Sequence, residues 1–84
     1  MKKDYAELLE EWKQDCPLVR WRKAKGLSRA KIAAALHVAL NSINNWETGA
    51  TVPSDKSLAR IADAMKDPNV KEAWMTWLEQ QPKL

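Results

Sequence analysis

Apolar residues recur along the chain at the three- and four-residue spacing of helices, and the alternation typical of a half-buried strand is absent. The first amphipathic stripe predicts an N-terminal helix, and its apolar members are Tyr5, Leu8, Leu9 and Trp12. Pro17 ends this helix and suits the first turn of the next one. The pattern therefore favours an all-α fold.

The second predicted helix starts at Pro17 and directs Leu18 and Trp21 towards the core. It stops at Gly26, and Leu27 is the apolar residue that commonly follows a helix ending in a Schellman motif. These signals give the helix a defined start and stop.

The third predicted helix is capped by Ser28 and has Ile32, Ala33 and Leu36 on its inward face. A turn of barely three residues, 37–39, connects it to a fourth helix. Because two helices joined by so tight a turn must cross closely, we expect the small side chain of Ala33 at their contact.

The fourth predicted helix lies in the segment LNSINNWETG, residues 40–49. Ile43 and Trp46 are three residues apart, as on one buried face, and Gly49 is a C-terminal stop. Asparagine is a mediocre helix former because its amide competes with the backbone for hydrogen bonds. The exposed side nevertheless carries three of them: Asn41, Asn44 and Asn45. We interpret this row as a binding face rather than as three solvated amides without a partner.

Two more helices follow a loop. The fifth is capped by Ser54 or a neighbour, and its buried residues are Leu58, Ile61, Ala62 and Met65. In the last helix we expect Asp67 as the N-cap and Pro68 at the first position. Its apolar stripe is Val70, Trp74, Trp77 and Leu78. The chain is thus expected to be a single all-α domain, 1–84, with five to six helices and no internal repeat.

The length and the cysteine count narrow the class of protein. Eighty-four residues suffice for one small domain with a core of limited size. The lone Cys16 cannot form an intramolecular disulfide, which fits a reducing cytosol, and we expect it to be a buried small residue at a helix junction. The basic start soon turns acidic without a long apolar run, so we expect no signal peptide, no membrane partner and a cytoplasmic location.

The charges are distributed unevenly. Residues 1–16 sum to −2, residues 17–60 to +6 and residues 61–84 to −1, which gives the chain its net charge of +3. A run of six cations within the middle segment contains no acid: Arg20, Arg22, Lys23, Lys25, Arg29 and Lys31. A basic centre with mildly acidic ends suggests a surface that faces a polyanion, and a solvated helix face is the alternative.

Residues for catalysis are missing from the sequence. His37 and Cys16 are the only histidine and cysteine, and no third polar residue completes a catalytic set with them. The sequence also contains no metal-ligand cluster, no P-loop and no GxGxxG motif. We therefore expect no enzyme, no cofactor, no metal and no small-molecule substrate.

The middle of the chain resembles the helix-turn-helix domain of Cro and phage-repressor-like (Xre-type) regulators. Residues 20–65 contain the motifs R-K-x-K-G-L-S, I-A-x-x-L, V, I-x-x-W-E-x-G, P and L-x-x-I-A in the family order and at the family spacing. The resemblance implies a lambda-repressor-like bundle with a core at 17–66, to which the helices of segments 1–16 and 67–84 are additions or variants. Its expected function is sequence-specific binding of double-stranded DNA by a transcriptional repressor.

The resemblance also implies roles for individual residues. Helix 40–47 would enter the major groove, with base contacts from Leu40, Asn41 and Asn45 and second-tier or backbone contacts from Ser42 and Asn44. An asparagine amide suits adenine, and Leu40 suits a thymine methyl. Phosphate contacts would come from Ser28, Arg29, Lys31, Thr48 and Thr51. Arg22 and Glu47 match a family salt bridge that locks the second predicted helix to the reading helix.

Three departures from the family pattern predict weaker binding than average. His37 replaces the glycine of the turn, where a positive φ costs about 1–2 kcal/mol. Ala39 replaces a capping serine or threonine, which loses about 1 kcal/mol. The loop 48–52 lacks the cations that many relatives place against phosphate.

The competing interpretation is an antitoxin or assembly module, whose helix-turn-helix contacts protein or packages DNA without strict sequence choice. Specific operator binding should survive competitor DNA, whereas nonspecific packaging should not.

The ends of the chain suggest a homodimer, at least on DNA, because a single small helix-turn-helix offers little contact and relatives bind paired half-sites. Aromatic residues are enriched in interface cores, and we predict a dimer contact on the last helix from Trp74, Trp77 and Leu78. The alternative is that this stripe packs on the N-terminal helix of its own chain.

Overall fold

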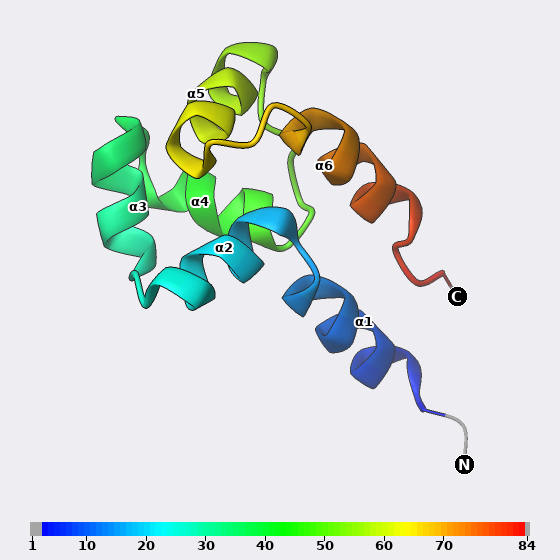
Figure 1. The fold of residues 1–84 in the computed structure, drawn as a ribbon. Coiled ribbons are helices and arrows are strands. Elements are labelled where there is room, and N and C mark those ends of the chain that lie inside the picture. Colours follow the sequence, from blue (N-terminus) through cyan, green and yellow to red (C-terminus); the bar gives the residue numbers. More distant parts are fainter. Residues whose placement is uncertain (1–2, 84) are drawn as a thin grey trace.

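A computed structural model describes residues 3–83, and within that range the chain folds into six helices without a strand (Figure 1). They are α1 (Tyr5–Gln14), α2 (Pro17–Lys25), α3 (Arg29–Leu36), α4 (Leu40–Glu47), α5 (Asp55–Met65) and α6 (Val70–Glu79). The all-α expectation of five to six helices is confirmed. The helices α1 and α6 lie at the same end of the molecule, and α3 lies at the other (Figure 1).

The helix ends follow the local sequence signals closely. Gly26 has φ 66° at the end of α2, and the N–H of Leu27 donates to the carbonyl of Arg22 at 3.0 Å, as in a Schellman motif. The turn between α3 and α4 uses the same geometry at His37, with φ 57°, so this histidine does occupy the left-handed position of a glycine. Ala39 precedes α4 without a side-chain cap, as expected.

The start of α6 differs from the prediction. Asp67 and Pro68 were expected as the N-cap and the first helical residue, but the helix begins at Val70 and its N-cap is Asn69. The backbone N–H of Asp67 closes the end of α5 on the carbonyl of Ala62, at 3.0 Å. Asp67 is therefore part of the end of α5 and not the cap of α6. Its carboxylate accepts from the N–H of Asn69 (2.9 Å) in the turn between the two helices.

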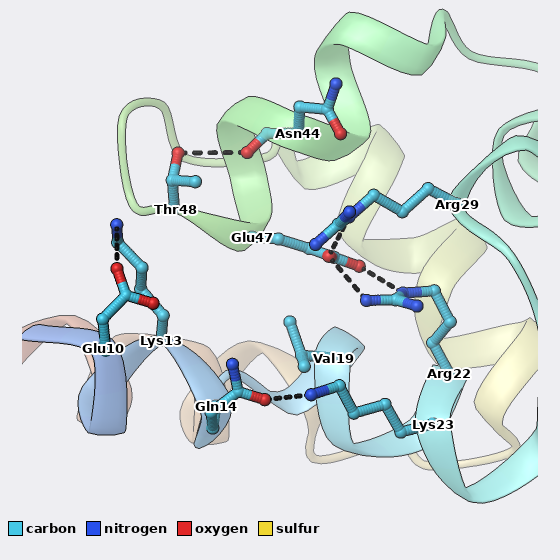
Figure 2. A pocket seen from close by; sticks show the side chains of 10 residues that line it. All are labelled: Glu10, Lys13, Gln14, Val19, Arg22, Lys23, Arg29, Asn44, Glu47 and Thr48. Carbon is cyan, nitrogen blue, oxygen red and sulfur yellow. Dashed lines mark hydrogen bonds and ion pairs between the residues drawn. The ribbon is translucent and has the colours of Figure 1, made fainter.

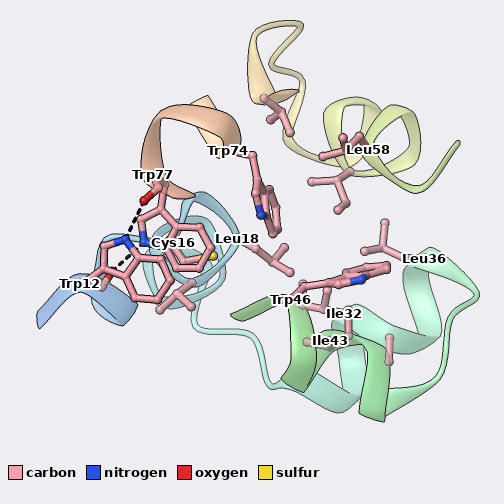
Figure 3. Close-up of a cluster of buried hydrophobic side chains, with 14 residues drawn as sticks. Trp12, Cys16, Leu18, Ile32, Leu36, Ile43, Trp46, Leu58, Trp74 and Trp77 are labelled. Carbon is pink, nitrogen blue, oxygen red and sulfur yellow. Dashed lines mark hydrogen bonds between the residues drawn. The ribbon is translucent and has the colours of Figure 1, made fainter. Parts of the chain in front are cut away.

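The core joins all six helices, and α3 packs mainly on α4 (Figure 3). Its largest fully buried side chains are Trp74, Leu18, Ile32, Ile43, Ile61, Val70 and Cys16. Ala33 is buried, and Val38 in the turn packs against the core. The core therefore holds α3 and α4 at a fixed crossing angle.

A reciprocal pair of tryptophans ties α1 to α6. The indole Nε1 of Trp12 donates to the carbonyl of Trp77 at 2.6 Å, and the Nε1 of Trp77 donates to the carbonyl of Trp12 at 2.7 Å. The two rings are stacked with centroids 4.1 Å apart (Figure 3). Both side chains thus have their apolar and polar partners within the chain.

This pair corrects the predicted dimer contact. Trp77 is 2% exposed and Trp74 is fully buried, so neither side chain offers surface to a second chain. The alternative, that the stripe packs on the N-terminal helix of its own chain, is confirmed for Trp12, while Leu8 is 41% exposed on the outside of α1. Leu78 is half-buried. Dimerisation itself stays a prediction.

Gly49 brings α1 against the end of α4. It has φ 77°, and a Cβ placed there would lie 2.5 Å from Cη2 of Trp12. The glycine is therefore required both by its backbone conformation and by the close approach of the indole. This contact fixes the position of α1 beside α4.

Candidate nucleic-acid interface

The face of α4 opposite the core is polar and accessible. Ile43, Trp46 and Glu47 form the buried side of the helix. On the other side Leu40 is 47% exposed, and Asn41 and Asn44 are exposed as well. Of the remaining predicted contacts, Ser42 and Asn45 are half-buried. The structure thus brings the predicted reading residues together on one helix, with Leu40, Asn41 and Asn44 the most accessible.

The hydrogen bonds at the end of α4 involve a threonine hydroxyl rather than the asparagine side chains. Thr48 Oγ1 donates towards the backbone carbonyls of Asn44 (3.0 Å) and Asn45 (3.3 Å). The backbone N–H groups of Ala50 and Thr51 also donate to the carbonyl of Asn45. The hydroxyl hydrogen of Thr48 is therefore engaged by the helix end, which leaves its oxygen only acceptor capacity towards an incoming ligand.

The start of α3 collects the predicted phosphate ligands. Ser28 is the N-cap, and its Oγ accepts from the N–H of Lys31 at 3.1 Å. Arg29 and Lys31 are exposed in the first turn, which contains no acid. Cations at this end oppose the helix dipole, whereas an anion at the same place is stabilised by it.

A buried carboxylate links this region to α4 (Figure 2). Glu47 is only 3% exposed, and its oxygens accept from Arg22 Nε at 2.9 Å and from Arg22 Nη2 at 3.1 Å. The predicted salt bridge between these residues is therefore confirmed. It fixes α2 to α4 through two parallel hydrogen bonds, which is the strongest form of such a pair.

Arg29 is a second partner of this carboxylate that the sequence did not reveal. Its Nε donates to Glu47 Oε1 at 2.8 Å, although its side chain remains 53% exposed. Two arginines on one carboxylate leave a surplus of positive charge, and Arg29 carries it to the surface. One signal was present in the sequence, because an arginine in the first turn of a helix opposes the helix dipole. The direction of its side chain, however, depends on how α3 crosses α4.

A cleft of about 430 Å³ opens beside this cluster, between α1, α2 and α4 (Figure 2). Its wall includes Lys13 and Gln14 from α1 and Lys23 from α2, none of which was predicted as a site residue. It also includes Asn44 and Thr48 from the end of α4. The N-terminal helix thus contributes to the surface on which α4 lies.

Cys16 is fully buried at the junction of α1 and α2, as expected, and burial raises the pKa of its thiol to about 11. Such a thiol stays protonated at neutral pH and is a poor nucleophile. Among residues 3–83 the structure contains no cluster of three or more histidine, cysteine or acidic side chains that would hold a metal ion. No helix in the same range is long and apolar enough to span a bilayer.

Comparison with known proteins assigns the central helices to a protein family. A family model described as "Helix-turn-helix" matches residues 18–66, which run from the first turn of α2 to Lys66, the residue directly after α5. No curated protein and no solved structure matches the chain. The matched segment contains α3, the tight turn and α4, and it leaves α1 and α6 outside.

Proposed function

The chain belongs to the Cro/C1-type helix-turn-helix family of DNA-binding proteins, and on that basis we propose that it is a sequence-specific transcriptional repressor. It reads the major groove of duplex DNA with α4, since that groove is wide enough for a helix. The observation that carries the proposal is the exposed, amide-rich face of α4 opposite Ile43 and Trp46.

The chemistry of this face suits base edges in the major groove. An asparagine amide accepts from the N6 amino group of adenine and donates to its N7, so Asn41 and Asn45 are assigned to adenine. Leu40 is assigned to a thymine methyl, because its side chain is apolar and 47% exposed at the start of the helix. Ser42 and Asn44 flank these residues as second-tier or backbone contacts.

Phosphates beside the groove are assigned to the start of α3 and to the loop after α4. The free N–H groups of the first turn bind an oxyanion, and Arg29 and Lys31 supply the positive charge that orients it. Ser28 contributes its hydroxyl hydrogen, because in the cap its oxygen only accepts, from the N–H of Lys31. Thr51 is the exposed candidate in the loop. Thr48 donates to a phosphate only when its hydroxyl leaves the backbone carbonyls at the end of α4.

We further propose that two copies bind one operator, because a single motif of this size covers only one half-site. With Trp74 and Trp77 inside the core, the contact between the copies is assigned to surface residues, of which Leu78 remains from the predicted set. Sedimentation with a two-half-site duplex should give two chains per duplex. One chain per duplex at saturating concentration would contradict this assignment.

The base-reading role is tested with a site selected from a random duplex library. Asn41→Ala and Asn45→Ala should each weaken binding to that site by about 1–3 kcal/mol, while binding to unrelated duplex barely changes. Asn69→Ala is the matched control, because Asn69 is exposed at the start of α6 and its side chain makes no capping hydrogen bond. It should leave both affinities unchanged.

Two outcomes would overturn the proposal. Equal losses on selected and unrelated duplex would remove the base-reading role of α4. Failure of the selection to enrich any sequence would favour packaging without sequence choice.

A further inference from the structure

The cleft between α1, α2 and α4, called the α1 cleft below, is a positively charged hollow of the described surface (Figure 2). Four cations line it, Lys13, Arg22, Lys23 and Arg29, against the two acids Glu10 and Glu47. Four other hollows of the described surface carry no surplus of lysine and arginine over acids. The charge of the α1 cleft therefore favours an anionic ligand.

The positive charge of the α1 cleft is only partly neutralised by carboxylates. Glu47 is satisfied by the bidentate contact of Arg22, so Arg29 adds a charge beyond neutrality. Lys23 donates to the neutral side-chain oxygen of Gln14 and keeps its full charge. Lys13 contacts Glu10 at 3.3 Å, but Glu10 is 67% exposed, and such a pair is screened by water and exchanges easily.

The cleft also has a fixed shape, although one wall comes from outside the family segment. Trp12, the residue before Lys13, is held by Trp77 and lies against Gly49 at the end of α4. Lys13 therefore starts from a backbone held next to α4, so that no backbone segment has to be ordered when its side chain binds a ligand.

We propose that the α1 cleft is a phosphate-binding site, in which Lys13 and Lys23 join Arg29 in holding one phosphate group. The inference rests on the proposed function where the phosphate belongs to duplex DNA. In that case α1 adds a contact to the DNA backbone near the end of α4. This contact comes from Lys13, which lies outside the segment that the family model matches. A free phosphate compound is the other source of the same chemistry, and its size fits a cleft of about 430 Å³.

The DNA arm of the test measures duplex affinity against salt concentration for Lys13→Gln/Lys23→Gln. Loss of one phosphate contact should lower the magnitude of the slope of log K against log salt by about 0.9. Lys71→Gln/Lys83→Gln is the matched control, because it removes the same charge from exposed positions on α6 and after it. It should leave the slope unchanged, and circular dichroism should report the same helicity for all three proteins.

The second arm titrates pyrophosphate into the protein without DNA and follows amide chemical shifts near residues 13, 23 and 29. A salt slope lowered only in the cleft variant supports the site with DNA as its source. Saturable shifts in wild type that the cleft variant loses, with an unchanged slope, support the site with a free phosphate compound as its source. An unchanged slope without such shifts overturns the inference.

These readouts separate the inference from the proposed function. If Asn41→Ala weakens the selected site while the cleft variant behaves like wild type in both arms, base reading stands and the phosphate site falls. If no sequence is selected but the slope on unrelated duplex still drops in the cleft variant, the phosphate site stands and specific repression falls.

Discussion

Glu47→Gln removes a negative charge from the point where α2, α3 and α4 meet. Glu47 is 3% exposed, and Oε2 accepts from Arg22 Nε while Oε1 accepts from Arg22 Nη2 and Arg29 Nε. A glutamine of the same shape keeps one acceptor oxygen and sets an N–H₂ group against a guanidinium donor at the other position. Two donors then face one another where a hydrogen bond of 2.8–3.1 Å is now made.

The size of the effect follows from the exposure of the two arginines. Removing one partner of a buried ion pair costs about 3–5 kcal/mol, because the other charge is left buried. The side chain of Arg29 is 53% exposed and can return to water, so its share of that cost is small. The side chain of Arg22 is 11% exposed, and in the variant its acceptors are the carbonyl of Leu27, at 3.4 Å, and the one oxygen of the glutamine. With one acceptor retained, we expect the free energy of unfolding to fall by about 2–4 kcal/mol.

Urea unfolding followed by circular dichroism and tryptophan fluorescence measures this change. A loss of that size is a large part of the roughly 5–15 kcal/mol that stabilises a small domain, so the midpoint should shift clearly. Arg29→Gln is the comparison, and it should cost at most about 1 kcal/mol because it removes the exposed partner. A free energy of unfolding of Glu47→Gln that lies within about 0.5 kcal/mol of the wild-type value, or is no lower than that of Arg29→Gln, would refute this expectation. The buried pair with Arg22 would then not hold the helices together.

Three further predictions test other parts of the structure. Gly49→Ala should lower stability by at least about 1–3 kcal/mol in the same urea assay, because its Cβ meets Trp12 and its φ is positive; a neutral result would refute the contact. Trp77→Phe should cost about 0.5–1.5 kcal/mol more than Trp74→Phe, because it removes the indole N–H that donates to the Trp12 carbonyl at 2.7 Å, whereas Trp74 Nε1 is buried without a partner among residues 3–83; equal losses would contradict this. Cys16 should resist thiol reagents at pH 8 until the protein unfolds. Since its pKa is raised from 9.0 to about 11, its contribution to stability is present below pH 9 and is lost from pH 9 towards 11, a fall that Cys16→Ala should lack.

The helix boundaries were largely predictable because they depend on residues close in sequence. Gly26 ends α2, Ser28 caps α3 and Ser54 caps α5, each through hydrogen bonds that span only a few residues. The left-handed conformation of His37 was expected from the family resemblance, because this residue replaces the glycine of the turn. The late start of α6 was missed, since Asp67 is a good capping residue that the end of α5 already uses.

The partners of long or aromatic side chains could not be predicted in the same way. The stripe on α6 fits an intramolecular or an intermolecular partner equally well, and only the position of Trp12, 65 residues away, distinguishes them. Arg29 reaches Glu47 across 18 residues, and its flexible side chain offered no periodic signal. The pair of Arg22 and Glu47 was predicted only because the family resemblance supplied it.

Charge sums along the sequence hide the contribution of α1 to the candidate interface. Residues 1–16 sum to −2, which suggests a segment that DNA repels. A helix presents different residues on different sides, however, and the acids Glu7 and Glu11 do not line the α1 cleft. Of the charged residues of α1, Lys13 and Glu10 line it, so α1 brings no net negative charge to the cleft. Trp12 decides which side faces α4, because its indole fits only against a residue without a Cβ at position 49. The electrostatic role of the N-terminal helix therefore depends on a packing contact between α1 and the end of α4 rather than on its net charge.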